Sequence, residues 1–229
     1  MRQSTAAHRL AFALSVLFHP ILLPFAVDLL NWGAMVQPTP GIFVVKIIGY
    51  LVFPAVITRL WQRRRGINDL LLQERRHRPV PLLALLLGAT LVGLICTYVL
   101  APPLTPHLHY RLVILLTLAA LAGTFFLKIS LHALGWGAAT GLALLLVLLP
   151  ENGIPFICGY PQMSSQFVFL TLILLVVAII GSGVVIAARH YLGAHNWSQL
   201  GIGWLLGFLI GGLFMAYWTI DGVPALHLF

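Results

Sequence analysis

Residues 167–187 read FVFLTLILLVVAIIGSGVVIA, an uninterrupted run of 21 positions without a charged side chain. A helix of this length spans about 30 Å, the thickness of the hydrocarbon core of a bilayer. The whole chain has the same character. Of its 229 residues, 60% are hydrophobic and 8% are charged, whereas a soluble domain carries about 25% charged residues. The composition therefore excludes a soluble enzyme, a DNA-binding module or a disordered chain, and it predicts a polytopic membrane protein.

Seven apolar runs approach the length of a membrane span. The first contains His19-Pro20 and Pro24, and because a proline removes a helical hydrogen bond, we expect a kinked or partial span there. The sequence thus predicts an all-α integral membrane protein, a bundle of six to seven transmembrane helices that forms one domain over residues 1–229. The runs are Leu10–Leu30, Gly41–Trp61, Val80–Ala101, Arg111–Leu127, Ala133–Leu149, Phe167–Ala187 and Leu200–Thr219.

Basic residues are distributed unevenly over the two sides that seven crossings would create. The chain has 13 Lys and Arg residues against 5 Asp and Glu, a net charge of +8. Only Lys46 and Arg111 fall on the side opposite the N-terminus, which leaves 11 of the 13 on the N-terminal side. The positive-inside rule makes the N-terminal side cytoplasmic. We expect the protein to lie in a bacterial inner (cytoplasmic) membrane.

Three polar clusters interrupt the apolar runs, and polar groups at membrane depth are costly enough to indicate function. They are Glu74–Pro79 (ERRHRP), Lys128–His132 (KISLH) and Ala188–His195 (ARHYLGAH), the last followed by Gln199. Two apolar runs separate each cluster from the next, and an even number of crossings returns the chain to the same face. All three clusters are therefore predicted to lie at one interface, where they can form one site.

The residue types in these clusters suit phosphoryl transfer. Arginine holds phosphate oxygens bidentately and stays charged at any working pH. Histidine can attack phosphorus or protonate a leaving oxygen, and a helix that starts next to Ser130 would add backbone N–H donors for an anion. Because no cluster of carboxylates indicates a divalent cation, a metal-independent mechanism without a cofactor is favoured.

The order of these motifs resembles the type 2 phosphatidic acid phosphatase (PAP2) superfamily, whose general pattern is K-x6-RP, then PSGH, then SR-x5-H-x3-D. Arg78-Pro79 match the first motif. Ser130 and His132 match the second, and Arg189 and His195 match the third, with Ala188 in place of its Ser. The matching stretch, residues 78–199, covers about half of the chain.

The resemblance implies a role for each matched residue. His195 would attack the phosphorus and become a phosphohistidine, and His132 would protonate the leaving lipid oxygen. Arg78, Arg189 and the region of Ser130 would bind the phosphoryl oxygens.

The chain departs from the family pattern at several positions. The expected first Lys is Leu71, so Lys128, Arg75 or Arg76 would have to supply its charge. In the second motif Ile129 and Leu131 replace Pro and Gly. In the third, Gln199 replaces the final Asp. The chain thus resembles a variant of the superfamily with a KIS-x-H second motif and a Gln at the last position.

Gln199 bears directly on catalysis. On a helix, i, i+4 spacing would put it beside His195, where its amide oxygen could accept the Nδ1 hydrogen and fix the tautomer. A neutral amide does not stabilise a developing imidazolium as a carboxylate does. In a serine protease the corresponding change from Asp to Asn lowers kcat by about 10⁴-fold. The substitution therefore bears on turnover more than on phosphate binding.

Local structure can also be predicted from small residues and prolines. Arg189 and His195 are six residues apart, about 240° around a helix, so they can share a site only if the chain breaks between them, and Gly193 allows such a break. His19-Pro20 is expected to be a kink and not a ligand. Spacing of four residues in two helices predicts close helix packing rather than catalysis, at Gly203, Gly207 and Gly211, and at Gly137 and Gly141.

The sequence as a whole predicts a membrane lipid-phosphate phosphatase that works through a phosphohistidine. Its partners would be membrane lipids and a lipid phosphate such as phosphatidate, phosphatidylglycerol phosphate or a polyprenyl diphosphate, and not nucleic acid. Charge counting puts the site at the cytoplasmic interface, whereas the family resemblance favours the outer side. One alternative is a protein of the same fold that binds or translocates lipid phosphates without hydrolysis. A second is a phosphotransferase that passes the phosphate to another acceptor.

Overall fold

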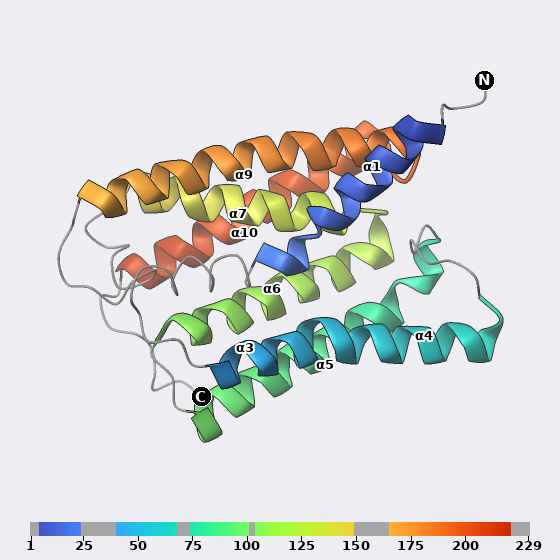
Figure 1. Cartoon of the computed structure of the whole chain (residues 1–229), viewed down its shortest axis with the longest axis horizontal. Coiled ribbons are helices and arrows are strands. Elements are labelled where there is room, and N and C mark those ends of the chain that lie inside the picture. Colours follow the sequence, from blue (N-terminus) through green and yellow to red (C-terminus); the bar gives the residue numbers. More distant parts are fainter. Residues whose placement is uncertain (1–4, 24–39, 68–73, 101–103, 149–164, 221–229) are drawn as a thin grey trace. The chain divides into compact units, whose positions relative to one another are not determined.

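The computed structural model describes residues 5–23, 40–67, 74–100, 104–148 and 165–220, and all regular structure in these ranges is helical (Figure 1). The predicted all-α class is confirmed for this part of the chain. Within it, five helical segments are long and apolar enough to cross a membrane: Pro40–Arg65, Arg75–Leu100, Leu131–Leu148, Phe169–Tyr191 and Trp197–Tyr217. Two shorter apolar helices, Ala6–Leu22 and Tyr110–Phe126, correspond to the other two predicted runs.

The structure divides into two compact units, and a single domain over residues 1–229 stays a prediction from the sequence. Unit 1 contains residues 1–20 and 129–229, and unit 2 contains residues 21–128. The three predicted clusters are divided between them. Unit 2 holds Glu74–Pro79 and Lys128, and unit 1 holds Ser130, His132 and the whole of the third cluster.

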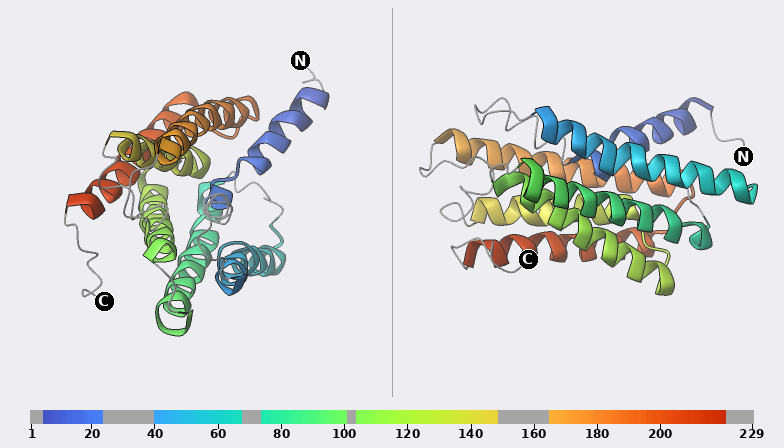
Figure 2. Two further views of the ribbon diagram at one scale, coloured as in Figure 1. Left: turned by 60° about the vertical axis from the view of Figure 1, so that its left-hand side comes forward. Right: turned by 90° about the horizontal axis from the view of Figure 1, so that it is seen from below.

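Unit 1 consists of α1 (Thr5–Leu17), α7 (Leu131–Leu148), α9 (Ser165–Tyr191) and α10 (Trp197–Ile220). Helix α7 packs against both α9 and α10, and α1 contacts α9, an arrangement that Figure 2 shows from two directions. Because α7 and α10 run antiparallel to α9, the start of α7, the end of α9 and the start of α10 lie at the same end of this unit. The same end holds Ser130 and His132 of the second polar cluster and the whole of the third.

Small residues bring the backbones of α7 and α10 into contact. A methyl group built on Gly207 would collide with the carbonyl oxygen of Leu134, and one built on Gly211 with that of Ala138. In the opposite direction, Gly137 and Gly141 lie against carbonyl oxygens of α10. Membrane helices associate through such contacts because lipid provides no hydrophobic driving force between them. The predicted packing role of both glycine series is confirmed.

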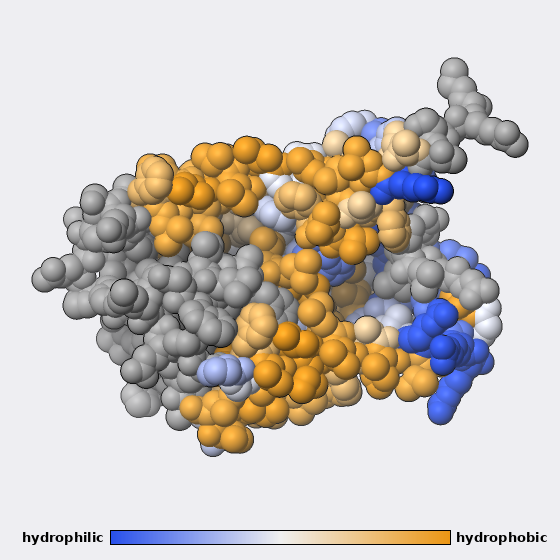
Figure 3. Space-filling view, viewed as in Figure 1, coloured by the Kyte–Doolittle hydropathy of each residue, from blue (hydrophilic) through white to orange (hydrophobic). Residues whose placement is uncertain are grey.

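Unit 2 contains one long helical segment made of α3 (Pro40–Lys46), the π-helix η2 (Ile47–Val52) and α4 (Phe53–Arg65). It also contains the 3₁₀-helix η3 (Arg75–His77), α5 (Pro79–Ile95), the π-helix η4 (Cys96–Leu100) and α6 (Leu104–Phe126). Helix α6 begins seven residues before Arg111, where the apolar run begins in the sequence. Figure 3 shows the end of α4, which carries the exposed Arg63, Arg64 and Arg65, as strongly hydrophilic beside the apolar helix surfaces.

The first predicted span is interrupted at the expected place. Helix α1 ends at Leu17, and after a turn at Phe18 and His19 a 3₁₀-helix, η1 (Pro20–Leu22), follows. Pro20 has no N–H to donate to Val16, and the N–H of His19 instead bonds to the Val16 carbonyl at 3.1 Å. The prediction of a break is therefore confirmed for residues 10–23, and the rest of that run lies outside the described residues.

We predict that Gly207→Ala lowers the stability of the protein, because the added methyl would force α10 away from Leu134. The expected loss is about 1–3 kcal/mol, measured as a lower thermal unfolding midpoint in detergent. The matched control is Gly201→Ala in the same helix, where an added methyl meets nothing within 4 Å. The control is expected to leave the midpoint unchanged or raise it slightly, since Ala favours helix more than Gly. Equal midpoints for the two variants would contradict the close packing of α7 and α10.

Candidate functional site

The corner between α9 and α10 is built on a left-handed residue, Gly193, with a φ of 66°. The N–H of Gly193 donates to the carbonyl of His190 at 2.9 Å, and the N–H of Ala194 donates to that of Arg189 at 3.2 Å. These two bonds form a Schellman motif, which ends α9 and satisfies its last carbonyls. The break that the sequence predicts between Arg189 and His195 is therefore confirmed. It keeps both residues at the same end of the bundle.

Helix α10 begins with a capping box. The N–H of Gln199 donates to Oδ1 of Asn196 at 2.9 Å, and the N–H of Asn196 donates to Oε1 of Gln199 at 3.4 Å. The same Oε1 lies 3.2 Å from Nδ1 of His195. The predicted contact between His195 and Gln199 is confirmed, but the predicted geometry is wrong. His195 precedes α10, and Gln199 reaches it as the capping residue of that helix.

This arrangement determines the tautomer of His195. The backbone N–H of Asn196 can only donate, so it identifies Oε1 as the amide atom that faces it. Because Oε1 can only accept, the nearby Nδ1 of His195 carries the hydrogen. In the neutral ring, Nε2 is then the nitrogen with the lone pair. A nucleophilic histidine needs a nitrogen with a lone pair, and its orienting partner here is a neutral amide.

Ser130 and His132 lie at the start of α7. The Ser130 hydroxyl accepts a hydrogen bond from the N–H of Ala133 at 3.4 Å, and the Ser130 carbonyl accepts one from the N–H of Leu134 at 2.9 Å. Ser130 is therefore the N-cap of α7, which confirms the predicted helix start. Its side chain is fully buried. His132, two residues into the helix, donates from Nε2 to the carbonyl of Ser15 at 3.1 Å, because a carbonyl can only accept.

Arg189 is the most informative side chain of unit 1. It is 4% exposed, and NH1 donates to the hydroxyl of Ser15 at 3.3 Å. Its Nε is buried without a hydrogen-bond partner among the described residues. The chain has 5 acidic residues, and those of unit 1, Glu151 and Asp221, lie outside the described ranges. The guanidinium of Arg189 is thus buried with an unmet donor, and the described part of its unit contains no carboxylate. Such a group is suited to binding an anion.

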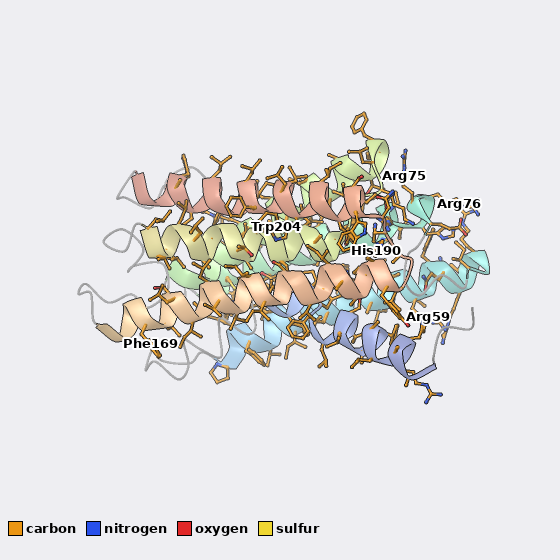
Figure 4. All side chains as sticks on the ribbon, turned by 90° about the horizontal axis from the view of Figure 1, so that it is seen from above. Arg59, Arg75, Arg76, Phe169, His190 and Trp204 are labelled. Carbon is orange, nitrogen blue, oxygen red and sulfur yellow. The ribbon has the colours of Figure 1, made fainter. Side chains whose placement is uncertain are left out.

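These side chains form one cluster around the buried guanidinium of Arg189. Arg189, His195 and His19 all lie near the ring of His132. The ring of His19 lies edge-on to that of His132, with the centroids 4.6 Å apart. Figure 4 shows His190, the neighbour of Arg189, at the end of α9 opposite Phe169, so the cluster lies at one end of the helices. Among the described residues, no group of three or more His, Cys, Asp or Glu side chains could hold a metal ion.

Ser15 and His19 are members of the cluster that no sequence motif predicts, and His19 is expected from the sequence only to be part of a kink. Ser15 belongs to the last turn of α1 and His19 follows that helix by two residues, and both contact residues that are more than 100 positions away in the chain. Their only sequence signal is that they are polar within an apolar run. Such residues often face the interior of a bundle, but nothing in the pattern links them to His132.

The remaining predicted site residues belong to unit 2. Arg78 is 3% exposed and immediately precedes α5, and Lys128 lies just after α6. Arg75 donates to the carbonyls of Phe125 at 2.5 Å and Phe126 at 3.4 Å, and so satisfies the end of α6. A phosphate-binding role for these three residues stays a prediction from the sequence. Leu71 lies outside the described residues.

Comparison of the chain with known protein families, with curated proteins and with solved structures finds no match in any of the three.

We predict that Gln199→Leu destroys the single tautomer of His195, because the acceptor for Nδ1–H is lost, while Gln199→Glu keeps it. Nitrogen-15 NMR of histidine-labelled protein in micelles would report the tautomer, with assignment by the His195→Ala variant. The expected spectrum of the wild type and of Gln199→Glu has the hydrogen on Nδ1, and that of Gln199→Leu has a mixture. An unchanged tautomer in Gln199→Leu would mean that another group orients His195.

Proposed function

We propose that the protein is a membrane lipid-phosphate phosphatase with His195 as nucleophile and His132 as general acid. The observation that carries the proposal is Arg189, a buried cation with an unmet donor in the cluster that contains both histidines. A phosphoryl group would supply the missing negative charge and acceptors. The position of the cluster at one end of apolar helices favours an amphiphilic substrate, with its phosphate at the interface and its tail in the bilayer.

The reaction would proceed in two displacements. Nε2 of His195 attacks phosphorus and the bond from phosphorus to the lipid oxygen breaks. His132 enters this step as the imidazolium and gives its Nδ1 proton to the departing alkoxide, while its Nε2–H stays on the Ser15 carbonyl. Water then attacks the phosphohistidine as His132 takes back a proton, the P–N bond breaks and inorganic phosphate leaves. Arg189 would hold the phosphoryl oxygens throughout, so its charge favours both transition states. Backbone N–H groups at the start of α7, beside Ser130, would add neutral donors.

The alternative is a protein that binds or moves lipid phosphates without hydrolysis. The observation in its favour is that Gln199, the orienting partner of His195, is neutral and also serves as the cap of α10. A neutral partner fixes the tautomer but contributes less than a carboxylate to stabilising the imidazolium. Arg189 and the histidines would then serve for recognition alone.

The test is release of inorganic phosphate by the purified protein from phosphatidate, phosphatidylglycerol phosphate and undecaprenyl diphosphate, with EDTA present throughout. We predict that His195→Ala lowers release by about 10³-fold or more, since the nucleophile is lost. The matched control is His190→Ala. His190 is exposed and belongs to the same corner, and its ring is tilted by 30° against that of Trp197, with the centroids 4.3 Å apart.

Release that requires His195 but not His190 would support the phosphatase. No release by a folded protein whose thermal midpoint rises with these lipids would favour the binding protein. Transfer of phosphate to an added alcohol, with less free phosphate, would instead identify a phosphotransferase.

A second prediction concerns Gln199→Glu, which preserves the capping box because Glu and Gln serve equally at this position. If the phosphatase proposal is correct, the carboxylate should raise kcat about tenfold or more by stabilising the imidazolium. In the binding protein the same change should weaken phosphate binding, because it adds negative charge, and should produce no release. Initial rates and phosphate titrations of the two proteins distinguish these outcomes, and a kcat below that of wild type would count against the nucleophilic role of His195.

A further inference from the structure

The end of α1 makes several polar contacts with the candidate site. The carbonyl of Ser15 accepts from Nε2 of His132 at 3.1 Å, and the hydroxyl of Ser15 accepts from Arg189 at 3.3 Å. Three residues later, the carbonyl of Phe18 accepts from Nε1 of Trp136 at 2.7 Å. These bonds tie α1 to α7 and α9, within unit 1. None of the three polar clusters in the sequence includes a residue of α1.

The break at Pro20 explains why the Ser15 carbonyl is available. In a continuous helix the N–H of His19 would bond to Ser15, four residues earlier. Because Pro20 has no N–H for Val16, the N–H of His19 bonds to Val16 instead. The Ser15 carbonyl is thereby left for His132, so the position of His132 depends on where α1 ends.

The hydroxyl of Ser15 has a hydrogen that it can donate. A serine hydroxyl can accept and donate at once. Here it accepts from Arg189, and Ser15 makes no other side-chain hydrogen bond within the described part of the chain. Its own hydrogen is therefore available, in a residue only 3% exposed. Beside it, the buried Nε of Arg189 is a second donor without an acceptor.

Two buried donors on adjacent side chains match two oxygens of one tetrahedral anion. Neighbouring donors of this kind cannot satisfy each other, and a carboxylate that could satisfy both is absent from the described residues of unit 1. A phosphate would accept from both and complete the hydrogen bonding of Ser15 and Arg189. We propose that Ser15 is a phosphate ligand, and that the end of α1 is therefore part of the phosphoryl site.

The catalytic half of this inference rests on the proposed function, but the binding half does not. Within the proposed reaction, Ser15 would bind the phosphoryl group in the substrate and in the transition state alike. Its loss should then raise KM more than it lowers kcat. Its carbonyl would hold Nε2 of His132 in either case, so removal of the hydroxyl alone leaves that contact in place.

Ser15→Ala tests the hydroxyl because it keeps the carbonyl. We expect KM for the lipid phosphate to rise about tenfold or more, with kcat within about threefold of wild type. The concentration of inorganic phosphate or orthovanadate that protects against thermal unfolding should rise by a similar factor. Ser15→Thr retains a hydroxyl and should restore both values. Val16→Ala, at an exposed neighbouring position of α1, is the matched control.

The outcomes separate this inference from the proposed function. If the wild type releases phosphate and Ser15→Ala has an unchanged KM and unchanged protection by phosphate, the role of Ser15 is overturned and the phosphatase stands. If no lipid is hydrolysed but phosphate protects the wild type and not Ser15→Ala, the phosphatase fails and Ser15 remains a phosphate ligand. A wild type that phosphate and orthovanadate do not protect overturns the inference. Should Ser15→Ala fold poorly, Ser15→Cys, which is nearly isosteric and a weak donor, replaces it in the same comparison.

Discussion

Every helix that ends within or near a bilayer must find partners for its unpaired backbone groups, because lipid offers none. In unit 1 this requirement and the candidate site involve the same residues. Gly193 completes the end of α9, Asn196 and Gln199 cap α10, and Ser130 caps α7. The end of α1 is completed by His132. The cluster of polar groups thus exists because four helix ends meet, and each end contributes a residue held in place by backbone hydrogen bonds.

Gln199 shows how a residue that both caps a helix and belongs to the candidate site is constrained. Its amide oxygen accepts from both the Asn196 backbone and His195, so it stabilises the start of α10 and fixes one histidine tautomer. Replacing it with Asp would shorten the side chain by one methylene and disturb the cap. A Gln at this position is therefore consistent with the local backbone, and the residue alone does not decide between turnover and binding.

Much of the fold follows from local sequence. The seven apolar runs correspond to helices, because apolar length is nearly sufficient to specify a membrane helix. The left-handed turn follows from Gly193, and the packing of α7 on α10 follows from glycines at intervals of four.

In the site, the contact between His195 and Gln199 could be predicted because the two residues are close in sequence. The roles of Ser15 and His19 could not be predicted, because their contacts with Arg189 and His132 depend on the tertiary packing of α1. The roles of Arg75, Arg78 and Lys128 depend on an arrangement of the two units that neither charge nor spacing determines.

The glycine contacts between α7 and α10 also affect how a lipid could reach the cluster. The backbones of the two helices touch at Gly207 with Leu134 and at Gly211 with Ala138. No side chain lies between the helices there, so an acyl chain has nothing to displace in order to enter. The seam between α7 and α10 is thus closed to lateral diffusion from the bilayer. Under the proposed function, a lipid tail whose phosphate binds at Arg189 would have to enter along another helix boundary.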